Sequence, residues 1–425
     1  MKLKTVAEGV RIFSYETSQF KTNKITIMMA MPLSSHVAAN AVLPFILTRS
    51  CKDYPDFSKL NARLAQLYGA SITADVLKAG DAQLLQIGIS FIDDRFALDE
   101  NERISSEAAE LLLKMLFEPN FVDGNFTPEA VETEKRLLIE TLNSELNNKR
   151  GYAIKRCTEI MCENELFSVN RLGTVEEIEA LCKNCIYNAW KSVLSTAPVQ
   201  INLIGNFDFE EIENKVTEYF DGIDRDVDEI ETEFINTVDE IKEVREEMDV
   251  KQSKLVIGMR TGMKNSDDDF PAYFVANAVY GGIPTSLLFT NVREKMSLCY
   301  YCSSMLRRGK GVMFVQSGVA SENYELAKNE ILKQLEDLQK GNFSDDVLDA
   351  AKRSMCDSLG GVYDHPDSIN SWYITQILNK KLLKAEDLCR KVEKVTREDV
   401  IRVAGNIIPD TIFLLDGKDE ANGNK

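Results

Sequence analysis

The sequence contains two copies of one pattern, and this repeat constrains the fold more than any other feature. Residues Arg63–Ile89 align without gaps on Arg293–Val319, so that Arg63 matches Arg293 and Gly88 matches Gly318. In both stretches a helix-like pattern leads into two strand-like runs. At the position where the second copy has Tyr300, the first copy has Ala70.

A second pair of anchors follows each copy. The sequence GNFT at Gly124–Thr127 matches GNFS at Gly341–Ser344, and each is followed by a helical pattern with a Lys-Arg pair at the same distance. Repeats of ~20–50 residues stack as solenoids, but this period is far longer. The sequence therefore predicts an α+β fold of two homologous domains, each a largely antiparallel sheet with helices packed on one face.

The first half has a clear order of predicted elements. Leu60, Leu64 and Leu67 lie on one face of a helix that ends at Gly69. We predict strands at Lys24–Ser34, Ala70–Lys78, Gln83–Ile92 and Val199–Gly205, and helices at Asn40–Ser50, Phe57–Tyr68, Ser105–Phe117, Thr127–Asn148, Tyr152–Glu163, Thr174–Leu194 and Phe209–Phe220.

An acidic segment separates the two halves. Asp224–Asp249 contains twelve Asp or Glu and three Lys or Arg. Such a composition is typical of an exposed, partly extended connector. We therefore predict an N-terminal domain at 1–223, a connector at 224–249 and a C-terminal domain at 250–425. Ligands often bind in clefts between domains, so we expect the two domains to face each other across one.

Composition excludes several classes of protein. A formal net charge of −18 would repel a nucleic acid backbone. The first residues have no apolar core of a signal peptide, and no run reaches the ~18 apolar residues of a membrane helix. Nine scattered cysteines favour reduced thiols over a disulfide framework. We therefore expect a cytoplasmic protein that binds neither nucleic acid nor membrane.

Two C-x-x-C pairs could form a zinc or redox site. Cys182 and Cys185 lie in a helical pattern, whereas Cys299 and Cys302 lie in a predicted strand, where residues three apart point to opposite faces. We interpret both spacings as chance. No serine stands in a hydrolase motif, and Gly281-Gly282 is too short for a phosphate loop.

The C-terminal copy carries a more specific signature. Gly281-Gly282 precedes a run that ends in Leu287-Leu288-Phe289, and R-E-x-x-x-L-x-Y follows from Arg293 to Tyr300. Together with the duplicated α+β layout, this pattern resembles the pitrilysin/insulinase (inverzincin) family of zinc metallopeptidases, in particular its mitochondrial-processing-peptidase-like branch. The resemblance is specific over Gly281–Tyr300 and extends over the whole chain in the order of its domains.

The resemblance implies roles for four residues. In that family the Arg and Tyr bind the substrate backbone near the scissile bond, which makes Arg293 and Tyr300 the candidate catalytic residues. A guanidinium and a phenol hydroxyl can donate to a peptide carbonyl and stabilise charge on its oxygen. Gly281 and Gly282 would let the backbone approach the substrate. Alternatively, Arg293 pairs with a surface acid and Tyr300 is an ordinary strand aromatic.

The metal-binding half of the family's site is missing. Its H-x-x-E-H motif supplies two zinc-binding histidines and a general base. Pro44, Leu47 and Thr48 occupy these positions, and none can bind zinc. The chain has two histidines, and His36 has neither a Glu nor a second His at the required spacing, so we expect a surface or capping residue.

These observations lead to one leading hypothesis and two alternatives. We expect a non-catalytic, substrate-binding subunit of a heterodimeric zinc metallopeptidase, inactive alone, whose H-x-x-E-H-containing partner binds zinc. A peptide substrate would enter as an added strand. One alternative is a peptide-binding or scaffold pseudoenzyme with no role in hydrolysis. The other is an independent metallopeptidase with a relocated site, which two distant histidines do little to support.

Overall fold

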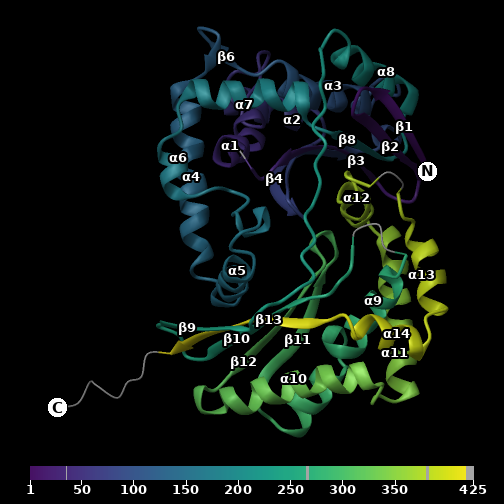
Figure 1. The fold of residues 1–425 in the computed structure, drawn as a ribbon. Coiled ribbons are helices and arrows are strands. Elements are labelled where there is room, and N and C mark those ends of the chain that lie inside the picture. The colour runs from purple at the N-terminus through teal and green to yellow at the C-terminus, as the bar shows by residue number, and fades with distance from the viewer. Residues whose placement is uncertain (35, 265–267, 380–381, 418–425) are drawn as a thin grey trace. The chain divides into compact units, whose positions relative to one another are not determined.

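The described residues of the computed structural model, 1–34, 36–264, 268–379 and 382–417, fall into two compact units (Figure 1). Unit 1 comprises Met1–Leu142, Asn170–Glu231 and Gly361–Leu383, and unit 2 comprises Asn143–Val169, Thr232–Gly360 and the residues from Lys384 onward. The units therefore differ from contiguous domains at 1–223 and 250–425, because each takes one segment from the other half of the chain. No helix in the described ranges is long and apolar enough to cross a membrane.

Unit 1 is built on a six-stranded sheet with the order β1-β2-β8-β3-β5-β4. All neighbouring strands are antiparallel except β2 and β8, which are parallel. The strands are β1 (Lys2–Ala7), β2 (Val10–Glu16), β3 (Thr22–Pro32), β4 (Ser71–Ala79), β5 (Ala82–Ile92) and β8 (Val199–Gly205), and a separate small hairpin is formed by β6 (Phe121–Val122) and β7 (Asn125–Phe126).

Helices pack on both faces of this sheet. One large core joins β2, β3, β5 and β8 to apolar residues of the unit's own helices, such as Val42, Leu112 and Val216. The helices of unit 1 are α1 (Val37–Leu47), α2 (Phe57–Gln66), α3 (Ile104–Phe117), α4 (Pro128–Glu145), whose end passes into unit 2, α6 (Val175–Glu179), α7 (Lys183–Thr196), α8 (Phe209–Phe220) and α12 (Pro366–Ile374), with short helices η1 (Asp94–Phe96) and η7 (Gly361–Tyr363).

Unit 2 is built on a five-stranded sheet with the order β11-β12-β10-β13-β9. Again one pair of neighbours, β13 and β9, is parallel and the others are antiparallel. The strands are β9 (Lys242–Met248), β10 (Ser253–Arg260), β11 (Cys299–Arg307), β12 (Val312–Val319) and β13 (Ile408–Gly417).

The helices of unit 2 include two π-helical segments in the stretch that carries the sequence signature. These are η3 (Ala278–Gly282) and η4 (Leu288–Lys295). The others are α5 (Lys149–Met161), α9 (Phe270–Asn277), α10 (Tyr324–Lys340), α11 (Asp345–Gly360), α13 (Ala385–Glu393) and α14 (Arg397–Ala404), with short helices η2 (Leu166–Ser168), η5 (Arg308–Lys310) and η6 (Ser321–Asn323).

The two sheets have the same topology, which confirms the predicted α+β fold of two homologous units. Across each sheet, the hairpin (β4-β5 or β11-β12) lies beside β3 or β10. Next come β8 or β13 and then its parallel neighbour, β2 or β9. Strand β9 lies within the segment expected to be an exposed connector, and it is the second copy of β2. Arg225, in the same segment, is buried and donates to the Glu8 carbonyl.

The second face of each sheet is covered by a helix from the other half of the chain, whereas the sequence predicted helices on one face. In unit 1, Tyr373 of the α12 helix stacks on Phe13 of β2 with ring centroids 4.1 Å apart. In unit 2, Cys157 and Met161 of α5 pack in one core with Phe413 of β13. Strands buried on both faces need helices on both, and β3 and β12 are buried almost throughout.

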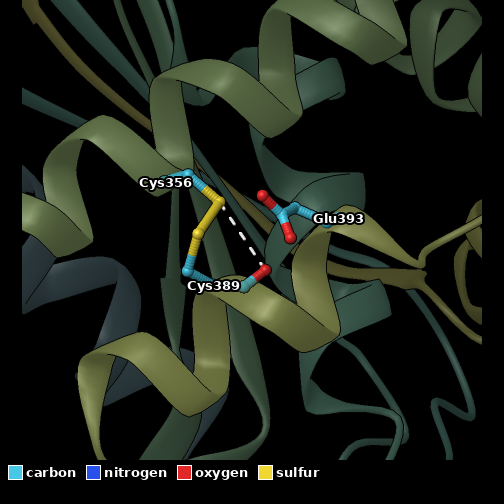
Figure 2. A group of neighbouring side chains, drawn as sticks. All are labelled: Cys356, Cys389 and Glu393. Carbon is cyan, nitrogen blue, oxygen red and sulfur yellow. Dashed lines mark hydrogen bonds between the residues drawn. A yellow bond between two sulfur atoms is a disulfide. The ribbon is translucent and has the colours of Figure 1, made fainter.

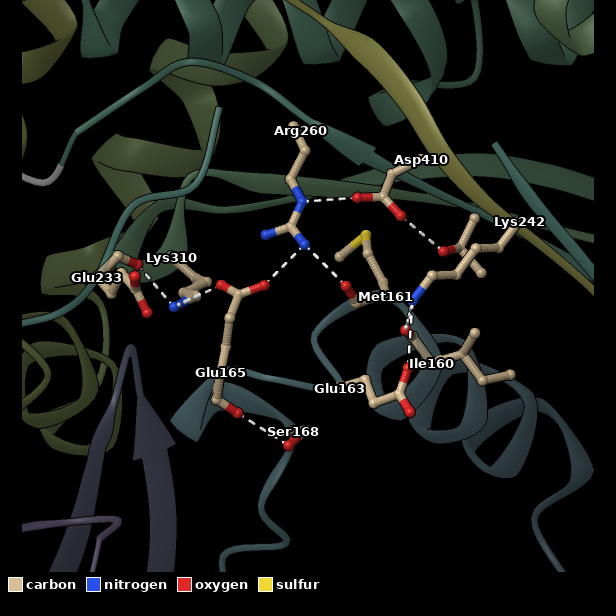
Figure 3. A network of polar contacts seen from close by, with 11 residues as sticks. Ile160, Met161, Glu163, Glu165, Ser168, Glu233, Lys242, Arg260, Lys310 and Asp410 are labelled. Carbon is tan, nitrogen blue, oxygen red and sulfur yellow. Dashed lines mark hydrogen bonds and ion pairs between the residues drawn. The ribbon is translucent and has the colours of Figure 1, made fainter. Parts of the chain in front are cut away.

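A buried ion network fastens the α5 segment to the sheet of unit 2 (Figure 3). The Glu165 carboxylate accepts from Arg260 Nη2 at 2.7 Å and pairs with Lys310 Nζ at 2.9 Å, and Arg260 Nε donates to Asp410 at 2.8 Å. Burial alone would raise the pKa of Glu165, but the two cations lower it below its ordinary value. Two carboxylates balance two cations, so no buried charge is left unpaired.

Candidate functional site

Tyr300 lies at a β-bulge on an edge strand. Strand β11 ends the sheet of unit 2, and its pairing with β12 shifts between Cys299, opposite Val319, and Tyr301, opposite Gly318. Tyr300 is the extra residue of this bulge, and its side chain is 76% exposed. Bulges bend an edge strand and reorient side chains, often next to active sites.

The first copy has no such bulge. In the β4-β5 hairpin Thr73 lies opposite Gly88 and the pairing is regular. Since Gly88 and Gly318 are equivalent, Thr73 corresponds to Tyr301 rather than to an earlier residue of β11. The match of Tyr300 with Ala70 is therefore wrong in structural terms, because Tyr300 has no counterpart in β4.

Arg293 lies near the end of the π-helix η4, just before β11. Its guanidinium carbon lies 4.4 Å from the centroid of the Phe289 ring, and Nη1 is 3.7 Å from a Glu294 carboxylate oxygen. Within the described ranges, no hydrogen bond engages the guanidinium, and its side chain is 38% exposed. π-Helical segments are rare and occur frequently at functional sites. The positive charge of Arg293 lowers the pKa of Cys299, the residue before Tyr300. Arg293 therefore lies close to the start of the strand that carries Tyr300.

Gly281 and Gly282 close the π-helix η3 rather than forming a turn before a helix. Neither has a positive φ, so conformational freedom does not explain them. Close packing explains the glycine at position 281, because a Cβ there would lie 2.6 Å from the Ser304 backbone nitrogen and 2.7 Å from Leu288 Cδ1. Gly281 is buried and Gly282 is exposed. The buried glycine therefore lets η3 pack on β11, whereas a Cβ on the exposed one would lie 2.9 Å from Asn277 Nδ2.

The bulge also changes the arrangement of Cys299 and Cys302. The sequence predicted that these residues point to opposite faces of the strand. This prediction is wrong, because the extra residue lies between them, and their partners on β12, Val319 and Ser317, are two residues apart. The Cys302 thiol is hydrogen-bonded to Cys299. Cys299 is partly exposed and Cys302 is buried.

The residues at the expected metal positions do not fit zinc. Pro44 and Leu47 are buried apolar residues of the first helix, α1, and Pro44 interrupts its hydrogen bonding. Thr48 Oγ1 donates back to the Pro44 carbonyl at 2.8 Å. His36 is exposed at the N-cap of this helix with φ of 54° and makes no capping bond. The side chains at the three motif positions, Pro44, Leu47 and Thr48, do not offer the His and Glu groups of a zinc site.

Four cysteines form disulfides, so the prediction of reduced thiols is wrong for them. Cys182 is the N-cap of α7 and is bonded to Cys185, with Cα atoms 5.2 Å apart. This C-x-x-C pair is therefore not a chance spacing. Cys356 of α11 is bonded to Cys389 of α13, with Cα atoms 5.1 Å apart. The sequence could not predict this second bond, because it joins residues of two separate helices.

Glu393 lies beside the second disulfide (Figure 2). Its carboxylate and the sulfurs of Cys356 and Cys389 form, in the described part of the chain, the one cluster of Cys, His, Asp or Glu side chains close enough to hold a metal. Both sulfurs are committed to the disulfide, and a thiolate is the form that binds zinc. The cluster is therefore a structural cross-link here.

Comparisons with known proteins find related sequences and folds. Residues 184–355 match the family model described as "Peptidase M16 inactive domain". A "Probable inactive metalloprotease YmfF" of Bacillus subtilis is 28% identical over 99% of both chains. Two solved structures share the fold over almost their whole length.

The first of these structures, a conserved protein from Enterococcus faecalis, has a TM-score of 0.89 and 25% identity, with 99% of each chain covered. The second, a peptidase M16 inactive domain from Pseudomonas fluorescens, has a TM-score of 0.81 and 16% identity, with 98% of this chain and 97% of that chain covered. These matches extend over both units and agree with the duplicated α+β fold. Residues 184–355 of the chain are similar to an M16 peptidase inactive domain, and almost the whole chain is similar to a probable inactive metalloprotease.

Proposed function

We propose that this chain is the non-catalytic, substrate-binding subunit of a heterodimeric M16 peptidase that acts on peptides. A partner chain with H-x-x-E-H supplies the zinc and the general base, and this chain supplies Arg293 and Tyr300. The observation that carries the proposal is that Tyr300 is 76% exposed on a bulge of an edge strand. An ordinary strand aromatic would bury its ring against neighbours.

Arg293 supports the same role. Its guanidinium stacks on Phe289 and lies at 3.7 Å from one exposed carboxylate, a contact too long for a hydrogen bond. Its N–H groups therefore remain available to donate to a peptide carbonyl. Together with the Tyr300 hydroxyl, such donors favour negative charge that develops on that oxygen during hydrolysis.

The edge of the sheet offers a second means of binding. Strand β11 pairs with β12 on one side and ends the sheet on the other. An extended peptide can add to such an edge through main-chain hydrogen bonds, which give affinity with little demand on sequence. Gly282 is exposed and has no side chain that could obstruct a peptide backbone, whereas the buried Gly281 serves packing.

The experiment mixes the purified chain with the H-x-x-E-H homologue from the same organism and measures cleavage of fluorogenic peptides. We expect neither chain alone to cleave at the rate of the mixture. We also expect zinc to purify with the partner, because positions 44, 47 and 48 of this chain cannot bind it. Peptide binding without cleavage in any mixture would favour the scaffold or peptide-binding alternative.

A further inference from the structure

The surface beside Arg293 contains a pair of thiols that the proposed function does not use. Cys299 and Cys302 flank the bulge in β11, and both are free. Because of the extra residue, they lie on the same face of the strand and their sulfurs are hydrogen-bonded. One thiol is partly exposed and the other is buried behind it.

The groups around this pair favour ionisation of the outer thiol. Cys302 donates to Cys299, and the positive charge of Arg293 from η4 acts in the same direction, so the pKa of Cys299 falls to about 7 although burial opposes the change. The pKa of Cys302 rises, because its proton is held by Cys299. Tyr301, on the same strand, is a further titratable neighbour. The Ser317 side chain also lowers the pKa of Cys299, by more than Arg293 does, and its hydroxyl donates to the Tyr301 carbonyl at 2.9 Å.

We propose that Cys299 and Cys302 are a peroxide-sensitive thiol pair, with Cys299 the attacking thiolate and Cys302 the resolving thiol. An accessible thiolate next to a cation and a second thiol is the arrangement expected of such a site. The proposal stands on the geometry of the bulge and does not depend on whether the chain takes part in peptide hydrolysis.

The reaction needs a hydroperoxide as the oxidant. The Cys299 thiolate attacks one oxygen of the hydroperoxide, the O–O bond breaks, and the alcohol or water leaves with a proton. The sulfenic acid on Cys299 is then attacked by the Cys302 sulfur, the S–O bond breaks and water leaves as the disulfide forms. Two thiols and one hydroperoxide therefore give one disulfide, one alcohol or water, and one further water.

Other cysteines of unit 2 provide an internal comparison. Cys157 and Cys162 are fully buried in the core between α5 and the sheet, and burial raises the pKa of both thiols. We expect them to stay reduced in the folded chain under conditions that oxidise Cys299. Both are pairs of nearby thiols in one chain. The two pairs therefore differ in how easily a thiol ionises and in how accessible it is to an oxidant.

The experiment treats the full chain with one equivalent of hydrogen peroxide at pH 7, followed by alkylation and tryptic peptide mapping. Met296–Arg307 is a single tryptic peptide that contains Cys299 and Cys302 and no other cysteine. We expect this peptide to lose two hydrogens and to gain no alkyl group. The peptide with Cys157 and Cys162 should gain two alkyl groups when the chain is alkylated after unfolding. A Met296–Arg307 peptide that still takes two alkyl groups would overturn the proposal.

Two variants separate the roles of the residues. In Cys302→Ser the disulfide is lost, and a sulfenic acid on Cys299 is trapped by dimedone; absence of this adduct contradicts the role of Cys299 as the attacking thiolate. Arg293→Ala removes the positive charge near Cys299. The midpoint of the pH profile for alkylation of Cys299 should then move upward from about 7. An unchanged midpoint would show that Arg293 does not favour the thiolate. Each result is read from thiol chemistry, so it is distinct from any failure of peptide cleavage.

Discussion

The two hairpins, β4-β5 in unit 1 and β11-β12 in unit 2, descend from one pattern but differ at the start of their first strand. In unit 1 the pairing is regular, and Arg63 of the preceding helix forms an ion pair with Glu107. In unit 2 the bulge projects Tyr300, and Arg293 forms no comparable pair within the described ranges. The first arginine stabilises its own unit, whereas the second has one carboxylate contact, at 3.7 Å to Glu294, and is the one we propose to bind a ligand.

The helices that each unit takes from the other half of the chain also differ in how they are held. In unit 1, the α12 segment is held by hydrogen bonds from Arg11 to the carbonyls of Gln376 and Asn379, both at 2.6 Å, and by a 2.6 Å ion pair between Lys24 and the exposed Asp367. In unit 2, the α5 segment is fastened by the buried network around Glu165. Neutral carbonyls tolerate the loss of one donor better than a buried charge tolerates the loss of its partner.

The largest expected effect is therefore on Glu165. Replacing Glu165 by Gln leaves Arg260 and Lys310 with one carboxylate between them, and we expect unit 2 to lose about 3–5 kcal/mol of stability. Hydrogen exchange should show faster exchange in α5, β10 and β12 than in unit 1. Glu163→Gln is the matched control, since its 70% exposed side chain makes a 3.4 Å ion pair with Lys242 worth at most about 1 kcal/mol.

The same network predicts a direction for the pH dependence. The pKa of Glu165 in the folded chain lies below its ordinary value of 4.5, so its ion pairs stabilise unit 2 fully above that value. This contribution is lost as the pH falls through the lowered pKa. Exchange protection in α5 should therefore decline at acid pH in the native chain and decline less in Glu165→Gln. Equal declines in both would contradict the role of this carboxylate.

The next effect compares the two arginines directly. In the mixed complex, Arg293→Ala should lower kcat/KM for peptide cleavage by about 100-fold or more, the effect typical of losing one donor to a developing oxyanion. Arg63→Ala should leave cleavage unchanged and cost unit 1 at most about 1 kcal/mol, because its ion pair is at the surface. Similar losses of cleavage in both variants would remove the functional distinction between the copies.

A smaller effect distinguishes the two glycines before β11. Gly281→Ala should destabilise unit 2 by about 1–3 kcal/mol, since its Cβ would meet backbone 2.6 Å away. Gly282→Ala should cost less, because its nearest neighbour is the side-chain amide of Asn277 at 2.9 Å, which can move. If Gly282 lies against substrate, its variant should instead raise KM for peptide cleavage. Thermal unfolding and steady-state kinetics measure the two effects separately.

The sequence predicted the repeat, the hairpins and the first long helices because these depend on local periodicity and on turn residues such as Gly69 and Gly80. It could not show which sheet a given helix covers, because the apolar residues of α12 do not specify the sheet on which they pack. That choice is made by tertiary contacts such as Tyr373 on Phe13.

The candidate site was predicted less completely. The spacing of Arg293 and Tyr300 made both residues candidates, but it could not show that Tyr300 is the extra residue of a bulge. A single inserted residue leaves no signal in a pattern with a period of two. For the same reason the proximity of Cys299 and Cys302 was missed. The bond between Cys356 and Cys389 depends on the packing of two helices, α11 and α13, which spacing does not reveal.

The most direct test of the central claim is deletion of Tyr300. Without it Cys299 precedes Tyr301, and β11 can pair regularly with β12 as β4 does with β5. The measurement is kcat/KM for peptide cleavage by the mixed complex, beside Tyr300→Phe, which removes the hydroxyl alone. We predict a folded chain and a loss at least as large as the loss of about 100-fold expected for Tyr300→Phe. A folded deletion variant that supports cleavage at the native rate would contradict the account.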